Sequence, residues 1–259
     1  MSNKIINTEQ GHWLLAKMGK RVLRPGGRKL TLQLVDELHI QQEDNIVEFA
    51  PGLGFTASLL LHKKPKTYTG IELNEEAAAL LQKKINYNGY KVVNASASTT
   101  GIDNNSVNKV IGEAMLTMQP DHRKSDIIKE AFRILKPGGY YGIHELGLIP
   151  DNIDATIKND VQQSLAKAIK VNARPLTKTE WCKLLEKEGF TIKEVKENAM
   201  SLLKLKRIIA DEGILRTFKI YFNILTHPKA KRKISEMRNT FNKYEHNLTA
   251  FAIIAEKKC

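Results

Sequence analysis

Apolar and polar positions alternate regularly along the first 150 residues of the chain. Short apolar or β-branched runs predict strands at residues 45–50, 67–73, 91–94, 108–113 and 140–146. Amphipathic stretches of helical length separate most of them, at residues 56–62, 75–88 and 121–135. Such repetition predicts a doubly wound α/β fold, in which helices cover both faces of a mainly parallel sheet.

Helices are also expected on either side of this repetition. Residues 8–20 and 29–39 predict two helices before the sheet, separated by the helix-breaking turn Arg24-Pro25-Gly26-Gly27. Residues 153–171 predict a helix after the fifth strand, and a second helix is expected to open at Thr177. There, a Thr at the N-cap with a Glu three residues later is typical of a capping box.

The last third of the chain predicts a sixth strand at residues 190–195 and a basic segment of two or three helices at residues 201–238. These helices are expected to break at Gly213 and at His227-Pro228. A buried last strand is predicted at residues 248–256. No repeat or flexible linker divides the 259 residues, so we expect a single domain. Its parts are N-terminal helices (about 1–40), a core (45–197), a basic helical cap (199–245) and the last strand (248–257).

The composition is typical of a globular protein, with 42% hydrophobic and 27% charged residues. The two cysteines, Cys182 and Cys259, are too few for a disulfide framework or a zinc site, which favours a reducing compartment. No apolar run approaches the ~18 residues that a membrane-spanning helix needs, and the first ten residues lack a signal-peptide core. We therefore expect a soluble, cytoplasmic protein.

The net charge of +13 is unevenly distributed. Residues 1–150 carry 19 basic and 15 acidic residues, whereas residues 151–259 carry 22 and 13. Most of the excess falls in the basic segment, with ten basic residues against three acidic ones. A nucleic-acid footprint usually spreads more widely, so the pattern disfavours nucleic acid as a partner without excluding it.

The strongest local motif is Val-Glu-Phe-Ala-Pro-Gly-Leu-Gly at residues 47–54, where a strand runs into a Gly-x-Gly turn that opens a helix. Glycines at Gly52 and Gly54 allow a tight turn and the close approach of a ligand. Glu72 closes the next strand, where a carboxylate can accept hydrogen bonds from both ribose hydroxyls of an adenosine-type ligand. Residues 52–57 also match the nicotinamide or flavin fingerprint, so the motif by itself leaves the ligand open.

The wider context resembles the class I S-adenosylmethionine-dependent methyltransferases, particularly their small-molecule branch of quinone- and sterol-type enzymes. The resemblance covers residues 45–197 and the last strand, and is carried by residues 47–54, 70–74, 95–98, 102–110, 130–139 and 184–190. The run Glu-Ala-Phe-Arg-Ile-Leu-Lys-Pro-Gly-Gly at 130–139 is its most specific part, and nicotinamide dehydrogenases lack it. The resemblance implies a seven-stranded sheet with an antiparallel last strand, a helical cap over the acceptor site, and S-adenosylmethionine as cofactor.

The resemblance also implies the cofactor-binding residues. These are Glu48, Ala50, Pro51, Gly52, Gly54, Glu72, Leu73, Ala95, Ser96 and Glu113. Glu48 is expected near the amino group of the methionine moiety. The sequence departs from the family at Ala50, which replaces the first glycine, at Ser96, which replaces an aspartate that binds adenine, and at Val107-Asn108, which replaces Phe-Asp.

Polar groups for acid–base chemistry are expected at the carboxyl ends of strands four and five, where open α/β sheets bind ligands. Glu113, His144 and Glu145 are the candidates. Strand alternation directs the side chains of adjacent residues to opposite faces, so one member of the His144–Glu145 pair is expected to be structural. Two ligands without a third do not make a metal site, and none is predicted. On the preceding helix, Trp13 is interpreted as core or as a cover over the cofactor.

These observations predict an S-adenosylmethionine-dependent methyltransferase that acts by in-line displacement on an apolar or anionic small molecule. The apolar positions among the lysines and arginines of the basic segment favour an anionic or amphiphilic acceptor, or a peripheral membrane contact through residues 201–238. Methylation of RNA or protein is the alternative, and a non-catalytic, cofactor-binding regulatory module is a second. The acceptor, its nucleophilic atom and the oligomeric state are left open.

Overall fold

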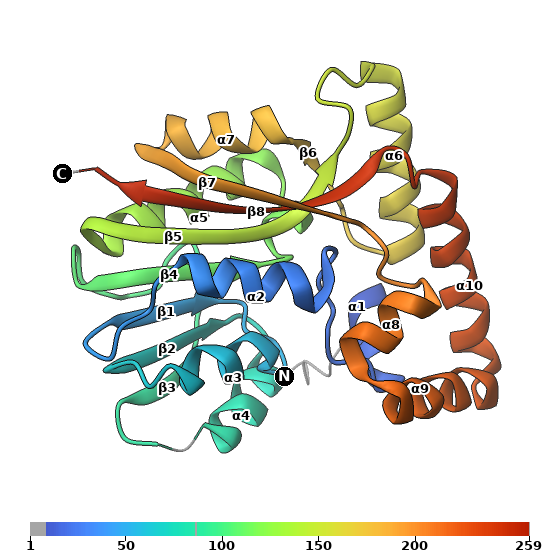
Figure 1. Ribbon diagram of the computed structural model, residues 1–259, viewed down its shortest axis with the longest axis horizontal. Coiled ribbons are helices and arrows are strands. Elements are labelled where there is room, and N and C mark those ends of the chain that lie inside the picture. The colour runs from blue at the N-terminus through green and yellow to red at the C-terminus, as the bar shows by residue number, and fades with distance from the viewer. Residues whose placement is uncertain (1–8, 86, 259) are drawn as a thin grey trace, which may run out of the picture.

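The computed structural model describes residues 9–85 and 87–258. Its centre is a mixed sheet with the order β3-β2-β1-β4-β5-β8-β7, and the two-residue strand β6 pairs with β5 (Figure 1). β8 is antiparallel to both of its neighbours, whereas the pairs from β3 through β5 are parallel. The predicted fold class is confirmed, with β6 as an addition.

The strands follow the predicted pattern closely. They are β1 (Asn45–Phe49), β2 (Thr67–Glu72), β3 (Tyr90–Asn94), β4 (Val107–Glu113), β5 (Leu135–Leu148), β6 (Leu176–Thr177), β7 (Phe190–Ala199) and β8 (Leu248–Lys257). The largest difference is β5, which begins at Leu135 rather than near residue 140. A register irregularity against β4 accommodates the Lys-Pro-Gly-Gly run within the strand.

Helices occur where amphipathic stretches were predicted. They are α1 (Gly11–Lys17), α2 (Gly27–Glu37), α3 (Phe55–His62), α4 (Glu75–Lys84), α5 (Asp121–Ile134), α6 (Ala155–Ile169), α7 (Lys178–Lys187), α8 (Leu205–Glu212), α9 (Ile214–Thr226) and α10 (Pro228–Lys243), with a short 3₁₀ turn, η1 (Leu116–Met118). The capping box at Thr177 is present. Thr8, the predicted start of the first helix, lies outside the described residues.

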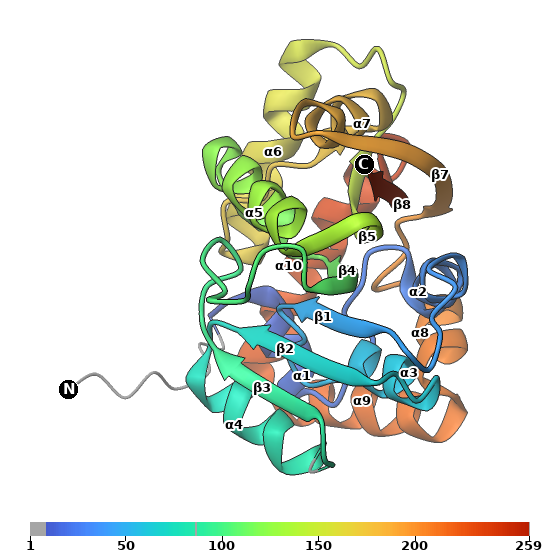
Figure 2. The same ribbon diagram turned by 90° about the vertical axis from the view of Figure 1, so that its left-hand side faces the viewer.

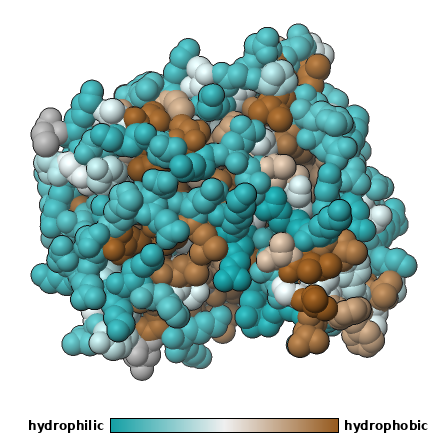
Figure 3. Space-filling view, viewed as in Figure 1, coloured by the Kyte–Doolittle hydropathy of each residue, from teal (hydrophilic) through white to brown (hydrophobic). Residues whose placement is uncertain are grey.

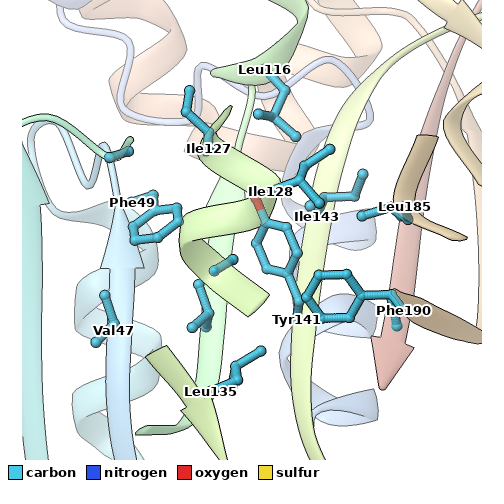
Figure 4. Close-up of a cluster of buried hydrophobic side chains, with 14 of the residues drawn as sticks. Val47, Phe49, Leu116, Ile127, Ile128, Leu135, Tyr141, Ile143, Leu185 and Phe190 are labelled. Carbon is cyan, nitrogen blue, oxygen red and sulfur yellow. The ribbon is translucent and has the colours of Figure 1, made fainter. Parts of the chain in front are cut away.

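Two apolar clusters cover the two faces of the sheet. One lies between the sheet and helices α5 and α7, where Tyr141 packs beside Phe49 and Phe190 (Figure 4). The other lies under α2, α3 and α4. Successive side chains of β8 point to opposite faces of the sheet, so Ile253 belongs to the first cluster and Ile254 to the second.

A third apolar cluster lies beyond the sheet and joins α1, α6 and α10. Figure 1 shows α6 and α10 at the right of the sheet, with α8 beside the lower half of α10 and α9 at its foot. Figure 2 shows α2 and α5 on opposite sides of the strands. The chain turns from β1 towards β2 and β3 on one side and reaches β4 on the other. The carboxyl ends of β1 and β4 therefore form a topological switch point, where open α/β sheets bind ligands.

Candidate cofactor and acceptor site

The turn after β1 uses its two glycines for different purposes. A Cβ added at Gly52 would meet no atom within 4 Å, so the backbone there borders open space. At Gly54, which caps α3 with a φ of 86°, an added Cβ would lie 2.4 Å from Leu81. Gly52 therefore leaves room for a ligand and Gly54 allows α3 and α4 to pack closely. Ala50, at the family's first glycine, adopts a left-handed φ of 51°.

Glu72 is positioned by the backbone on both sides. Its Oε2 accepts a hydrogen bond from the Gly52 amide at 2.9 Å, and its Oε1 accepts one from the Asn74 amide at 2.9 Å. Burial raises the pKa of this carboxyl, although the backbone hydrogen bonds oppose the rise. Each oxygen retains a second lone pair, so the group can accept two further hydrogen bonds from a pair of ribose hydroxyls.

A cavity of about 570 Å³ lies at this edge of the sheet. Eight of the ten predicted cofactor residues line it, namely Ala50, Pro51, Gly52, Glu72, Leu73, Ala95, Ser96 and Glu113. The other two, Gly54 and Glu48, are not among its lining residues. Glu48 is fully buried, its carboxylate accepts a hydrogen bond from the Tyr68 hydroxyl at 2.6 Å, and burial raises its pKa to about 8. The expected contact of Glu48 with an amino group therefore finds no support in its position.

The loop after β3 closes the other end of this cavity. Ser96 and Ser98 place their hydroxyls 2.9 Å apart. Glu130 holds the loop from behind, because its Oε1 accepts hydrogen bonds from the amide and the hydroxyl of Thr100 at 2.7 and 2.6 Å. Glu130 thus acts on the site indirectly, because it fixes a loop that lines the cavity. It is the first residue of the Glu-Ala-Phe-Arg-Ile-Leu-Lys-Pro-Gly-Gly run at 130–139.

Glu113 is the most densely hydrogen-bonded group of the cavity wall. It accepts hydrogen bonds from the hydroxyls of Thr31, at 2.7 Å, and Thr56, and its Oε2 lies 3.5 Å from Arg24 Nε. Its Oε1 lies 2.7 Å from His144 Nδ1. Burial by itself raises the pKa of Glu113, but the His144 hydrogen bond and the charge of Arg24 outweigh it and hold the pKa at about 2. The carboxylate is therefore ionised and fully partnered.

His144 is engaged at both ring nitrogens. Its Nε2 accepts a hydrogen bond from the Gly26 amide at 3.0 Å, which assigns the proton to Nδ1 and makes that atom the donor to Glu113. The ring is fully buried and is not among the residues that line the cavity. These contacts do not support the predicted role of His144 as a base and instead make it a positioning residue.

Glu145 lies on the opposite face of β5 and anchors the loop after β4. Its two oxygens accept hydrogen bonds from the amides of Met115, Leu116 and Thr117, at 2.8–3.0 Å, and from the Thr117 hydroxyl at 2.7 Å. It does not line the cavity either. Strand alternation was predicted to make one of the two adjacent residues structural, and the contacts make both so.

Two residues that the motifs did not single out line the cavity, His12 on α1 and Arg24 in the turn before α2. Burial, with a contribution from the charge of Arg24, lowers the pKa of His12 to about 4, so its imidazole is neutral at pH 7. Trp13 lines the cavity as well, with its ring centroid 5.1 Å from that of His12. Two features of the sequence could have indicated these residues: the His12-Trp13 pair on a predicted helix, and the arginine that precedes the Pro-Gly-Gly turn.

A second, smaller cavity of about 100 Å³ adjoins the first. The two share His12, Leu23, Ala114 and Met118 as lining residues. Helices α1, α6 and α10 supply much of the remaining wall. Of the described residues that line it, only His12 and Thr117 carry polar side chains. Its chemistry suits an apolar group.

Helix α8 holds the segment that carries Arg24. Glu212 accepts hydrogen bonds from the amides of Arg21 and Val22 at 2.7 and 2.8 Å. Asp211 accepts one from the Arg28 amide at 2.9 Å. Lys20 is buried beside both carboxylates, with Nζ–O distances of 3.8 and 3.7 Å. The cap thereby fixes one wall of the cofactor cavity.

The Gly-x-Gly turn, the acidic end of β2 and the cavity at the switch point define a Rossmann-like protein with a site for an adenosine-type cofactor. The chain matches the family model of the methyltransferase domain over residues 47–143. It is 35% identical over 253 residues to an uncharacterized protein of Haemophilus influenzae, covering 96% of this chain and 98% of that one.

Two further similarities, one in sequence and one in structure, are also to methyltransferases. A phthiotriol/phenolphthiotriol dimycocerosates methyltransferase of Mycobacterium tuberculosis is 31% identical over 104 residues, which cover 39% of this chain and 37% of that one. The structure of Haemonchus contortus phosphoethanolamine N-methyltransferase 2 in complex with S-adenosyl-L-methionine matches with a TM-score of 0.72 at 18% identity, covering 97% of this chain and 58% of that one. The chain belongs to the class I S-adenosylmethionine-dependent methyltransferases, which confirms the predicted family and its cofactor. Its place in the small-molecule branch of quinone- and sterol-type enzymes stays a prediction.

Proposed function

We propose that this methyltransferase transfers the methyl group to an apolar small molecule, or to the apolar part of an amphiphilic one, bound in the smaller cavity. The observation that supports this is the junction of the two cavities, where Ala114, Met118 and His12 border both. At this junction, the nucleophilic atom of an acceptor in the smaller cavity would lie next to the methyl group of a cofactor in the larger one. Alignment of that kind is the main contribution a protein makes when the cofactor already supplies an activated group.

The residues present fit the cofactor. Glu72 offers lone pairs to the ribose, Gly52 provides open space beside the backbone, and Leu73 and Ser96 border the region expected to receive the adenine. Arg24, held by Glu113, is one of three arginines that line the cavity with Arg21 and Arg123, and it suits the carboxylate of the methionine moiety. When bound, S-adenosylmethionine supplies an electrophilic methyl group on a sulfonium.

The protein's own groups orient the acceptor and exclude water. His12 is the titratable group among the described residues that line the smaller cavity. Because its pKa is lowered to about 4, the imidazole is neutral and can accept a hydrogen bond from an acceptor hydroxyl or amine. A base with so low a pKa is weak, so we assign His12 to orienting the nucleophile.

Methylation of RNA or protein is the alternative. A macromolecular acceptor would need a polar approach to the junction, whereas the second cavity has an apolar wall. A non-catalytic module would need a cofactor site without an acceptor site beside it. The adjoining cavities favour small-molecule transfer over both.

The test combines labelled S-adenosylmethionine with three acceptor fractions: a solvent-extracted small-molecule pool from bacterial cells, total RNA, and total protein. We expect methyl label in the solvent-soluble fraction. Label confined to RNA or protein would overturn the acceptor class, and no label with any fraction, despite cofactor binding, would favour a non-catalytic module.

A pair of variants links the transfer to the smaller cavity. Ala173 is buried in its wall, so Ala173→Leu narrows the cavity without touching the residues around Glu72. We expect transfer to fall at least tenfold, because the three added carbon atoms occupy space in the cavity and overpacking of a tight site costs about 1–3 kcal/mol. Cofactor affinity, measured by calorimetry, should be unchanged. Ala155→Leu, an exposed position on α6, is the matched control.

A further inference from the structure

Helix α9 exposes a continuous apolar face to solvent. Its large apolar side chains recur at positions i, i+1, i+4, i+8 and i+11, which lie on one side of a helix. They are Ile214, Leu215, Phe218, Phe222 and Leu225, with exposed fractions of 62–87%. Figure 3 shows hydrophobic atoms gathered at the lower right, over α8 and α9. Exposed Leu205 and Ile209 lie on α8, which packs against α9.

The opposite side of α9 is attached to the body of the protein. Thr217 and Ile220 are buried there. Asn223 donates a hydrogen bond to the Met18 carbonyl at 3.0 Å, and Arg216 donates one to the Gly19 carbonyl at 3.3 Å. The helix is thus held by the segment that follows α1 while its apolar face points outward. Scattered exposed apolar residues need no explanation, but a contiguous group usually marks an interaction site.

The charges around this face are almost entirely basic. Residues 214–235 contain no Asp or Glu and six basic residues. Arg216 and Lys233 bond to the Gly19 carbonyl and to Glu9, whereas the other four, Lys219, Lys229, Lys231 and Arg232, are exposed. The two carboxylates of α8 point inward. The side chains of Asp211 and Glu212 are 2% and 1% exposed, beside buried Lys20. The outer surface of α8 and α9 therefore combines apolar and cationic groups.

We propose that α9 docks this protein on anionic phospholipid bilayers. The helix would lie in the plane of the interface, with its apolar face among the acyl chains and the exposed Lys219, Lys229, Lys231 and Arg232 near the headgroups. This combination of an apolar face with a basic flank is the physical signature of an interfacial helix. In the described part of the chain no helix is long and apolar enough to cross a membrane. The contact is accordingly peripheral.

Other occupants fit the surface less well. A second copy of the chain would bring an equally basic flank against this one, and the like charges would repel. Nucleic acid would match the charge, but the exposed face of α9 consists mainly of large apolar side chains, and only two of them, Phe218 and Phe222, are aromatic. A lipid surface satisfies both the apolar and the charged component.

Sedimentation with vesicles tests the proposal and requires no turnover. The purified protein is mixed with vesicles of phosphatidylcholine, or of phosphatidylcholine with about one-third phosphatidylglycerol. We expect binding to the anionic vesicles, at least tenfold stronger than to the neutral ones and weaker in high salt. Absence of binding to anionic vesicles at low salt would overturn the proposal.

Variants assign the binding to α9. The double variant Phe218→Ser, Phe222→Ser removes two exposed apolar side chains, and we expect it to lower vesicle affinity at least tenfold. Ile157→Ser, an exposed apolar position on α6, is the matched control and should bind as the parent does. Lys219→Gln with Lys229→Gln should reduce both the affinity and its salt dependence.

Two outcomes separate docking from its alternatives. Unaltered binding by the double Phe variant would place the lipid contact elsewhere and overturn the proposal. A concentration-dependent dimer that the double variant abolishes, with no vesicle binding by the parent, would make this face a subunit contact. All variants alter exposed side chains, so retained cofactor affinity serves as the check on folding.

Discussion

His144 lies between the Glu113 carboxylate and the backbone of Gly26, with its Nδ1 2.7 Å from Glu113 Oε1 and its Nε2 3.0 Å from the Gly26 amide. The imidazole therefore connects the end of β4 to the turn that carries Arg24. A histidine in such a bridge supports the position of a cofactor-facing cation without itself reaching the cavity.

Loss of the His144 bridge should lower the stability of the fold, and any loss of turnover should follow from that. We expect His144→Ala to lower the free energy of unfolding by about 3 kcal/mol, because a buried carboxylate loses a hydrogen-bonding partner. Cofactor affinity should fall with it, since the turn around Arg24 loses its anchor. Urea denaturation and calorimetry measure both, with exposed His62→Ala as the control. An unfolding free energy within about 0.5 kcal/mol of the parent, together with lost turnover, would identify His144 as a catalytic base instead.

Glu72 should dominate recognition of the cofactor ribose. We expect Glu72→Ala to raise the dissociation constant of S-adenosylmethionine about 100-fold or more, as two hydrogen bonds to a charged group contribute about 1.5–3 kcal/mol each. Calorimetric titration provides the measurement. Glu75→Ala, at an exposed position three residues on, should bind normally. Unchanged affinity in the Glu72 variant would refute the ribose assignment.

Buried Glu48 should make stability depend on pH. Its folded-state pKa of about 8 is higher than the ordinary value of 4.5, so the native protein retains a proton that the unfolded chain releases. Its contribution to stability is fully present below about pH 4.5 and is lost as the pH rises towards 8. We expect Glu48→Gln to gain stability relative to the parent over this window, measured by urea denaturation at several pH values. Exposed Glu43→Gln is the control, and a pH-independent difference would contradict the assignment.

Ala50 should be improved by the residue that the family usually has there. An L-residue at a φ of 51° carries a steric cost that glycine avoids. Allowing for the greater freedom of glycine in the unfolded chain, we expect Ala50→Gly to raise the free energy of unfolding by about 0.5–1 kcal/mol. Thermal denaturation measures the change, and cofactor affinity should stay within about twofold. Ala155→Gly, at the start of α6, should show no such gain, and a loss of stability in Ala50→Gly would mean that the methyl group packs usefully.

The elements most accurately predicted were those decided by neighbouring residues. The capping box of Thr177 and Glu180 starts α7, and the breaks at Gly213 and Pro228 separate α8, α9 and α10. Each depends on local backbone preferences that operate within a few residues. The start of β5 was misplaced because its first residue pairs with Val107 of β4, and such pairing is not encoded in the periodicity of the strand.

Acid–base assignments were the least predictable part of the site. Their positions at strand ends predicted that Glu113, His144 and Glu145 all face the site. Glu113 does line the cavity, whereas His144 and Glu145 form buried hydrogen bonds behind it. The difference lies in their partners. A carboxylate or an imidazole becomes reactive or structural according to which donors and acceptors surround it, and those come from other elements.

The sequence by itself determined the succession of strands and helices along the chain, the cofactor turn and the carboxylate of Glu72. One strand–turn–helix unit and the next strand build that half of the site. Only the tertiary structure decided the other half. Arg24 is fixed through contacts that bridge 191 residues from Arg21 to Glu212, and 118 from Gly26 to His144. The apolar cavity likewise takes its wall from α1, α6 and α10. Short-range backbone preferences can be read from neighbouring residues, whereas a cavity exists only where distant side chains pack and leave space between them.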